Sequence, residues 1–339
     1  MEIIEDKKLQ EMEMALAKEA RAYQGTGIKT LSIAGGLLGS LFISAFVFLL
    51  LKDSSVASIV VGLIVLLIVL YADKEFDSTV LDTACIGGYI AACAMMAHGI
   101  NKTYGNDNIT SLLLLAAALI VMRLTTNYML NFISVLIVAG SLFSFININN
   151  AYVLIHVLVA IFALTYTLFS LYEAKLLASG PKINTVYNSW RNAFFCALLA
   201  LLAYIAVDNL FGKHIKYEWI SSVVIIGIYL FFLNKLIDSL QIPRKHWIEI
   251  YSLSLLVMLM AVFSPAICGA ILLLLISFHT GHRLGLILSV IALIYFTGQF
   301  YYNLHYTLLV KSGIMFGTGI LFLAAWFILR KTLKRYEQG

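Results

Sequence analysis

Long apolar runs constrain this chain more than any other feature of its sequence. Stretches of about 18 or more residues with little charge recur between residues 28 and 330, and each is long enough to cross a bilayer as a helix. The runs are continuous rather than alternating, which excludes a transmembrane β-barrel. The sequence therefore predicts an all-α fold, a polytopic bundle of transmembrane helices.

Composition supports a membrane protein and excludes several other classes. Hydrophobic residues make up 61% of the chain and charged residues 12%, against roughly 25% charged in soluble domains. The four cysteines lie in apolar runs without C-x-x-C spacing, so we expect buried thiols rather than disulfides or metal ligands. The net charge of +5 reflects Lys and Arg at one membrane face and does not indicate nucleic-acid binding.

About twelve spans are predicted, within a range of ten to twelve. They cover residues 28–51, 56–72, 80–98, 109–122, 128–146, 151–171, 192–207, 220–236, 250–263, 266–278, 284–300 and 308–329. The two short spans around Ser264-Pro265 are kept separate. The ten-span alternative fuses these two spans and also fuses the fourth span with the fifth. The sixth span is expected to continue as helix past Glu173 until Gly180-Pro181 breaks it.

Positive charge is distributed unevenly between the two sides of this threading. With the N-terminus inside, 18 of the 23 Lys and Arg residues fall on the inner side. The five on the outer side are Lys52, Lys102, Lys213, Lys216 and Lys311. Because loops rich in Lys and Arg stay in the cytoplasm, both termini are predicted to be cytoplasmic.

Three segments are expected along the chain. Residues 1–27 form an amphipathic helix, because apolar residues recur there at spacings of three and four between charges. That helix either lies on the membrane surface or under the bundle, or docks a partner. Residues 28–330 form the transmembrane domain, and residues 331–339 form a basic cytoplasmic tail.

Two ionisable side chains stand out within the apolar runs. Asp82 lies near the start of the third span, where a buried charge costs roughly 2.5–3.5 kcal/mol on insertion scales. It is either hydrated one turn inside the interface or binds a proton or a cationic group, with Arg123 as a candidate partner. His156 lies in the sixth span, where we expect a hydrogen bond to a neighbouring helix rather than metal ligation.

Helix-breaking residues occur at matching places in the two halves of a six-plus-six layout. Gly87-Gly88 interrupts the third span, and Pro265 with Gly269 interrupts the ninth and tenth. Interrupted helices in corresponding positions form the midplane sites of many transporters. This pattern motivates the alternative hypothesis of a secondary transporter of a small solute.

Aromatic and polar residues gather where the last span begins. The stretch runs Phe300-Tyr301-Tyr302-Asn303-Leu304-His305-Tyr306-Thr307-Leu308-Leu309-Val310-Lys311-Ser312. Tyr301 and Tyr302 are typical of the aromatic belt at a membrane interface, to which Lys311 can snorkel back. The alternative is a docking surface or gate on the outer face, including Thr307 and Ser312.

This terminal stretch resembles a bacterial multi-pass membrane family known as domain of unknown function 4401, which is related to domain 2157. The residues that carry the resemblance are Phe300, Tyr301, Tyr302, Leu304, Thr307, Leu308, Leu309, Lys311 and Ser312. The family implies no known activity. It does imply a partner, because members are often encoded beside a smaller membrane-anchored protein of the GDYXXLXY type.

No catalytic motif is found, and neither an enzyme activity nor a cofactor is predicted. The chain lacks a Walker loop, an H-E-x-x-H helix, a G-x-S-x-G elbow and clustered carboxylates. The leading hypothesis is the membrane subunit of a complex in the bacterial inner membrane, in contact with the lipid bilayer and a small membrane-anchored partner.

Overall fold

The computed structural model describes residues 53–75, 79–207, 219–241 and 243–303, with isolated positions between 35 and 50 and between 312 and 323. All of its regular structure there is helical. The helices are α2 (Ser55–Glu75), α3 (Thr79–Tyr104), α4 (Asp107–Leu124), α5 (Tyr128–Ile148), α6 (Val153–Leu171), α7 (Glu173–Ala178), α8 (Pro181–Ala206), α9 (Trp219–Ser239), η2 (Arg244–His246), α10 (Trp247–Met260), α11 (Pro265–His279) and α12 (Arg283–Asn303).

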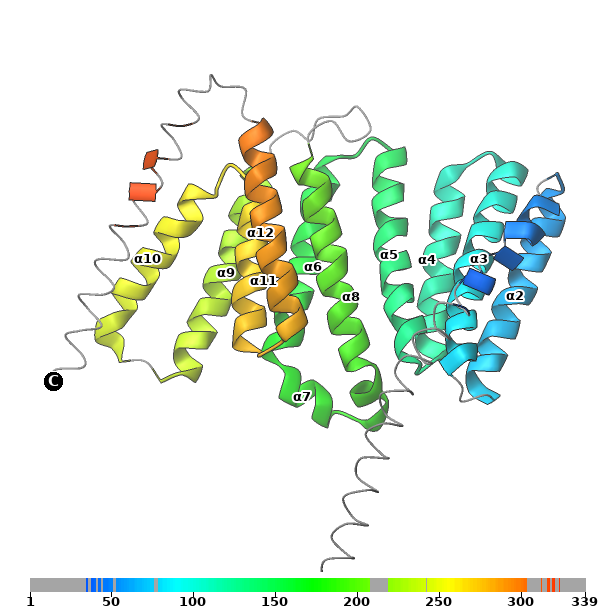
Figure 1. Cartoon of the computed structure of the whole chain (residues 1–339), viewed down its shortest axis with the longest axis horizontal. Helices are drawn as coiled ribbons and strands as arrows, with labels where there is room; N and C mark the ends of the chain where they lie inside the picture. The colour runs from blue at the N-terminus through cyan, green and yellow to red at the C-terminus, as the bar shows by residue number, and fades with distance from the viewer. Residues whose placement is uncertain are drawn as a thin grey trace, which may run out of the picture. The chain divides into compact units, whose positions relative to one another are not determined.

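The helices form two compact units (Figure 1). Unit 1 contains α2 to α5 and the first ten residues of α8, and unit 2 contains α6, α7, the rest of α8 and α9 to α12. Within the described residues, eight helices are long and apolar enough to cross a membrane: α2, α3, α4, α5, α6, α8, α9 and α12. Both α10 and α11 are shorter apolar helices. The all-α, polytopic architecture predicted from the sequence is thus observed.

Close helix contact in unit 1 depends on glycine. A Cβ atom on Gly62 of α2 would lie 3.0 Å from the carbonyl oxygen of Ala92, and one on Gly99 of α3 would lie 2.7 Å from that of Ser55. Small residues let the backbones of membrane helices approach in this way. Gly88 serves the same purpose, because its Cβ would lie 2.9 Å from Val69.

The predicted interruption of the third span is therefore wrong. Helix α3 runs without a break from Thr79 to Tyr104. Gly87-Gly88 lies inside it, since glycine costs a helix only about 1 kcal/mol and here provides room for neighbouring helices.

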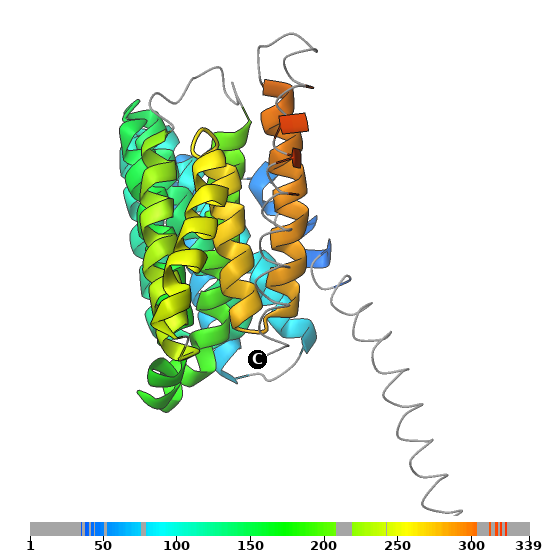
Figure 2. The ribbon, with the colours of Figure 1, turned by 90° about the vertical axis from the view of Figure 1, so that its left-hand side faces the viewer.

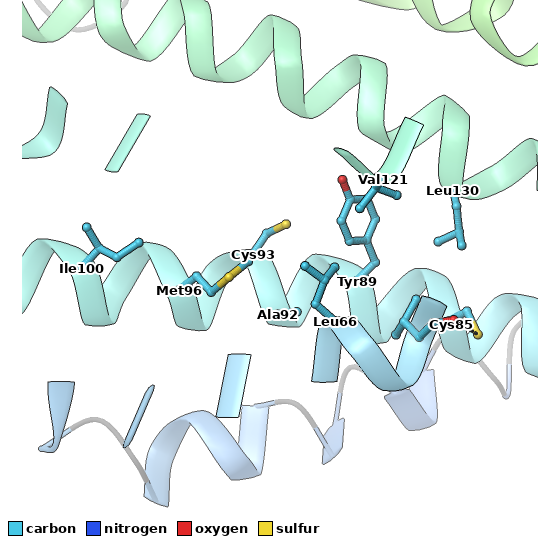
Figure 3. Close-up of a cluster of buried hydrophobic side chains, with 10 residues drawn as sticks. Leu66, Cys85, Tyr89, Ala92, Cys93, Met96, Ile100, Val121 and Leu130 are labelled. Atoms are coloured by element: carbon cyan, nitrogen blue, oxygen red, sulfur yellow. Dashed lines mark hydrogen bonds between the residues drawn. The ribbon is translucent and has the colours of Figure 1, made fainter. Parts of the chain in front are cut away.

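The core of unit 1 is centred on Tyr89 of α3. Figure 3 shows Leu66 of α2, Val121 of α4 and Leu130 of α5 converging on this fully buried ring. The Tyr89 hydroxyl lies 3.1 Å from Ser134 Oγ, and Ser134 also bonds the carbonyl of Leu130 at 2.7 Å. Aromatic packing and a satisfied hydroxyl thus tie α3 to α4 and α5.

Unit 2 packs α11 between α9 and α12, as Figure 2 shows from the side. Pro265 does not kink a helix but begins α11, where its missing N–H costs nothing. A turn at residues 261–264 reverses the chain after α10, and Ser264 N donates to the carbonyl of Ala261 at 2.8 Å. Gly269 then faces Leu202 of α8, whose Cδ1 a Cβ would approach to 2.3 Å.

The structure confirms two decisions on span boundaries and corrects two others. Helices α10 and α11 are separate, and residues 125–127 likewise separate α4 from α5. In contrast, the seventh span begins at Pro181 rather than at residue 192, because Gly180 and Pro181 start α8. The helix before that break ends at Leu171, and α7 is a distinct short helix. The predicted boundaries at residues 27 and 330, and with them the amphipathic N-terminal helix, lie outside the described residues.

Candidate functional site

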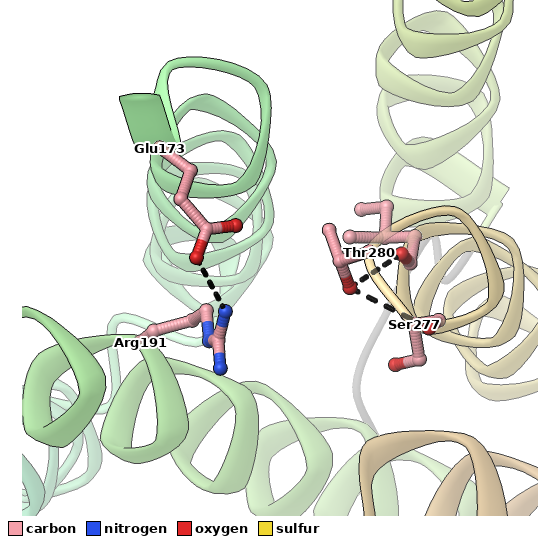
Figure 4. Close-up of polar contacts among 5 residues, drawn as sticks. Glu173, Arg191, Ser277 and Thr280 are labelled. Atoms are coloured by element: carbon pink, nitrogen blue, oxygen red, sulfur yellow. Dashed lines mark hydrogen bonds and ion pairs between the residues drawn. The ribbon is translucent and has the colours of Figure 1, made fainter. Parts of the chain in front are cut away.

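An ion pair in unit 2 is the most unusual polar feature of the described chain. Arg191 Nη1 lies 3.2 Å from Glu173 Oε1, and the side chains are 12% and 35% exposed. Glu173 is the first residue of α7, directly after α6, and Arg191 lies ten residues into α8. Figure 4 shows the arginine extending from α8 toward Glu173, with Ser277 of α11 and Thr280, which follows that helix, opposite. Ionisable side chains near the interior of a membrane bundle are functional candidates by default.

His282 completes the cluster from the connection between α11 and α12. Its Nδ1 accepts a hydrogen bond of 3.1 Å from the backbone N–H of Gly285, so the ring caps the start of α12. An accepting Nδ1 places the proton of the neutral ring on Nε2. Burial lowers the pKa of His282, the positive charge of Arg191 lowers this pKa further, and Glu173 opposes both effects.

Three hydroxyl groups lie beside these charged residues. The Tyr166 hydroxyl on α6 lies near Ser170, one turn away, and near Ser277 of α11. Both serine Oγ atoms are buried, and neither makes a hydrogen bond of normal geometry. A Cβ on Gly285 would lie 2.8 Å from Ser277 Oγ and 2.5 Å from His282 Nδ1, so these two groups share one small space that only glycine leaves open.

The cluster is suited to proton or anion chemistry. It combines one guanidinium, one carboxylate, one imidazole and several hydroxyls. The guanidinium and the hydroxyls can donate to a carboxylate or phosphate, whereas the carboxylate and the imidazole can accept and pass on a proton. No three His, Cys, Asp or Glu side chains of the described residues group as metal ligands.

A second polar network lies in unit 1, around the turn between α4 and α5. Asn127 Nδ2 donates to Asp82 Oδ1 at 3.1 Å, and the Thr125 hydroxyl donates to Asp73. Asn131 Nδ2 donates to the carbonyl of Thr125 at 3.1 Å. The indole N–H of Trp190 then donates to Asn131 Oδ1, which connects α8 to the same network.

The structure places two of the predicted site residues here, but not as a pair. Asp82 is bound by the amide of Asn127. Arg123 is exposed and forms no ion pair among the described residues, and its carbonyl accepts a bond of 3.0 Å from Lys182 Nζ. Asp82 is half-buried in the first turn of α3, a position that agrees with a carboxylate one turn inside the interface.

The predicted hydrogen bond of His156 to a neighbouring helix is confirmed. His156 is 3% exposed, and its Nδ1 lies 2.6 Å from Ser221 Oγ, which joins α6 to α9.

Part of the predicted aromatic stretch is described. The Tyr301 and Tyr302 rings meet edge to face at 5.8 Å, and Tyr302 is 78% exposed. Beside them, Asn303 Nδ2 donates to the carbonyl of Ala206 at 2.9 Å, which fixes the end of α12 against the end of α8. Ser312 is helical and exposed, whereas Thr307 and Lys311 lie outside the described residues.

Glu173 and Arg191 were missed as site residues, because Glu173 falls in the predicted helical continuation of the sixth span and Arg191 in the connection before the seventh span. Their signal was available in principle. They carry opposite charges on the two sides of Gly180-Pro181, and each adjoins a long apolar run. Charges in such positions lie at the membrane ends of two helices that a short connection holds together.

The eight candidate spans and the ionisable clusters at their ends define a polytopic helical membrane protein. The chain belongs to the family described as a domain of unknown function, DUF4401, whose model matches residues 27–332. The resemblance found in the terminal stretch is thereby confirmed. No curated protein and no solved structure matches the chain.

Proposed function

We propose that the protein is the membrane subunit of a complex and that α12 carries the docking surface. The supporting observation is Tyr295, which is 51% exposed and whose hydroxyl has no hydrogen bond among the described residues. Helix α12 packs inward through Gly285, Ser289, Ala292 and Phe296, so Tyr295 lies on its outer surface.

The depth of Tyr295 supports a protein partner on this surface. It lies eight residues before Asn303, or about 12 Å below that end of α12 at 1.5 Å per residue. Moving a hydroxyl out of water costs about 1–3 kcal/mol of free energy if it makes no hydrogen bond in its new environment. A second membrane helix that accepts this hydrogen bond removes the cost.

The docking surface contains a glycine next to Tyr295. Ile291, Tyr295, Gly298 and Tyr302 follow at spacings of four, three and four, which places them on one face of α12. A Cβ on Gly298 would have nothing within 4 Å, so the helix surface is open there. Glycine in such a position permits close approach of another helix. The partner proposed here is a small membrane-anchored protein of the GDYXXLXY type that the family resemblance implies.

The test is recovery of the partner after purification in mild detergent. We expect Tyr295→Phe to weaken partner recovery and Gly298→Leu to abolish it, with membrane abundance unchanged. The matched control is Gly227→Leu, because Gly227 on α9 is equally open. Full recovery with Gly298→Leu, or equal loss with Gly227→Leu, contradicts docking on α12.

We also propose twelve spans in the bacterial inner membrane, with both termini in the cytoplasm. The separation of α4 from α5 and of α10 from α11 supports the twelve-span threading. Reporter fusions after Asn106 and after Gly339 test it, because this threading puts these two positions on opposite sides. Reports from the same side of the membrane contradict it.

A secondary transporter is the second candidate, and the ion pair between Glu173 and Arg191 favours it. The site we propose for it lies at this pair instead of at an interruption of α3. A screen of cell metabolites by thermal shift tests it: a ligand should stabilise the native protein and the Arg123→Gln control, but not Arg191→Gln. The absence of enzyme activity stays a prediction from the motifs alone.

A further inference from the structure

A groove in unit 1 runs between α3 and α5 over α4. Its volume is about 480 Å³, and small side chains line most of it. Ala94 and Ala97 come from α3, Thr110 and Ser111 from α4, and Gly140 and Ser144 from α5. We call this feature the α3–α5 groove.

The groove is open because small side chains line its walls. The neighbouring helix surface, in contrast, is rich in large apolar side chains. Gly140 and Ser144 are exposed, and a Cβ on Gly140 would have nothing within 4 Å. The α5 residues along it extend from Ile137 to Ile148, a length of about 16 Å at 1.5 Å per residue. In a bilayer, such an open surface must be filled by another apolar group.

The end of the groove carries charge of both signs. A second hollow of about 340 Å³ shares Ala97 and Thr110 with the groove and is lined by His98, Asn101 and Lys102. Lys102 Nζ donates to the carbonyl of Asp53 at 2.9 Å, which holds the ammonium at this rim. Asp107 lines the groove itself and accepts a hydrogen bond from Asn101.

The rim lies where a lipid headgroup lies. Helix α3 ends at Tyr104 and α4 begins at Asp107, so Lys102 and Asp107 are at the membrane end of two candidate spans. The groove below them extends over about half of the roughly 30 Å hydrocarbon core. The hydrocarbon part of one leaflet is also half of this core, so the length of the groove fits a single acyl chain. A transmembrane helix, in contrast, needs a surface along the full core.

We propose that the α3–α5 groove binds one phospholipid with a phosphate and a primary ammonium in its headgroup. The acyl chain lies along Gly140 and Ser144, the phosphate faces Lys102, and the ammonium faces Asp107. A lysine ammonium is a compact donor for phosphate, and a carboxylate is a good acceptor for an ammonium group. The mixed charge of the rim therefore matches a zwitterionic headgroup rather than an anionic one.

The test uses purified, delipidated full-length protein and native mass spectrometry. Phosphatidylethanolamine or phosphatidylglycerol with identical chains is added, and the fraction of protein with one bound lipid is measured. We expect phosphatidylethanolamine to bind more tightly. Gly140→Leu should weaken both lipids about tenfold or more, because the leucine fills the groove, and the matched control Gly227→Leu on α9 should bind as the native protein does.

Two rim variants separate the parts of the headgroup. Lys102→Met should weaken both lipids, because it removes the contact to phosphate. Asp107→Asn should reduce phosphatidylethanolamine to the level of phosphatidylglycerol, because it removes the contact to the ammonium.

Several outcomes overturn the proposal. One is that Gly140→Leu binds lipid as well as the native protein does. Another is that Gly227→Leu loses as much lipid binding as Gly140→Leu. A third is that the native protein binds the two lipids equally. A further outcome also overturns the proposal. If a bound protein is recovered with the native chain but not with Gly140→Leu, and lipid binding is the same in both, the occupant of the groove is a helix.

Discussion

The polar clusters of the two units both contain carboxylates that must be hydrogen-bonded, and the two units supply different donors for them. In unit 1, Asp82 and Asp73 meet neutral donors, the amide of Asn127 and the hydroxyl of Thr125, which belong to one turn. In unit 2, Glu173 meets the guanidinium of Arg191, whose side chain is 12% exposed. Neutral donors satisfy a carboxylate whether or not it is charged, whereas an ion pair leaves a charge behind when one partner is removed.

This difference separates a structural cluster from a responsive one. The network of unit 1 connects α3, α5 and α8 and is expected to tolerate loss of a charge. The cluster of unit 2 couples three ionisable groups, Glu173, Arg191 and His282, beside several hydroxyls. It is expected to respond to pH, to mutation and to an anionic ligand.

The largest predicted effect is that of Glu173→Gln. This change leaves the guanidinium of Arg191 without its carboxylate and should destabilise the protein by about 1–2 kcal/mol, between the values for exposed and buried pairs, because the Glu173 side chain is 35% exposed. The measurement is thermal unfolding in detergent. The double variant Glu173→Gln with Arg191→Gln should be more stable than Glu173→Gln alone, because it also removes the charge left behind. If the double variant is equally or less stable, the cluster of unit 2 does not differ from that of unit 1 in this respect.

A smaller effect is predicted for acidification. The native pKa of His282 lies below its ordinary value, so between the two pKa values the native state binds fewer protons than the unfolded chain. Stability is therefore present above the ordinary pKa near 6.5 and is lost as pH falls toward the native pKa. A stability profile should therefore fall between pH 7 and pH 5.

The control for the pH effect is a second histidine three residues away. His279 is exposed and packs its ring edge to face on Phe232. The variant His282→Gln should flatten the profile, while His279→Gln should not. A native profile that is flat, or one that flattens equally in both variants, argues against a pH-responsive cluster in unit 2.

The smallest effect is predicted for Asp82→Asn. Asn127 can still donate to the oxygen of the new amide, so abundance and stability should change by less than about 0.5 kcal/mol. Membrane abundance and thermal unfolding measure this directly. A loss of stability as large as that of Glu173→Gln would mean that the charge of Asp82 is paired with a positive charge, as that of Glu173 is paired with Arg191.

Much of the fold follows from the sequence because a membrane helix must satisfy its backbone within itself. Long apolar runs therefore predicted spans, and Gly180-Pro181 predicted a break. Tertiary contacts decided what the sequence did not. Gly87-Gly88 predicts an interruption on local grounds, but a neighbouring helix fills the space beside it and α3 continues.

The candidate sites were predictable only in part. Asp82 and His156 stood out because a polar side chain inside an apolar run is visible without a structure. Arg191 did not, because the first turns of α8 are polar and on their own predict a loop. Contacts between distant helices, such as those joining Glu173, Arg191 and His282, depend on packing that a single sequence does not specify.

The central claim is that α12 docks a protein partner, and photocrosslinking in native membranes tests it most directly. A photoreactive amino acid replaces Tyr295 in one variant and Ile64 of α2 in another, since both side chains are about half exposed. We predict one discrete adduct with a small membrane-anchored protein from position 295, and only lipid adducts from position 64. Lipid adducts alone at position 295, or the same protein adduct from both positions, would contradict the claim.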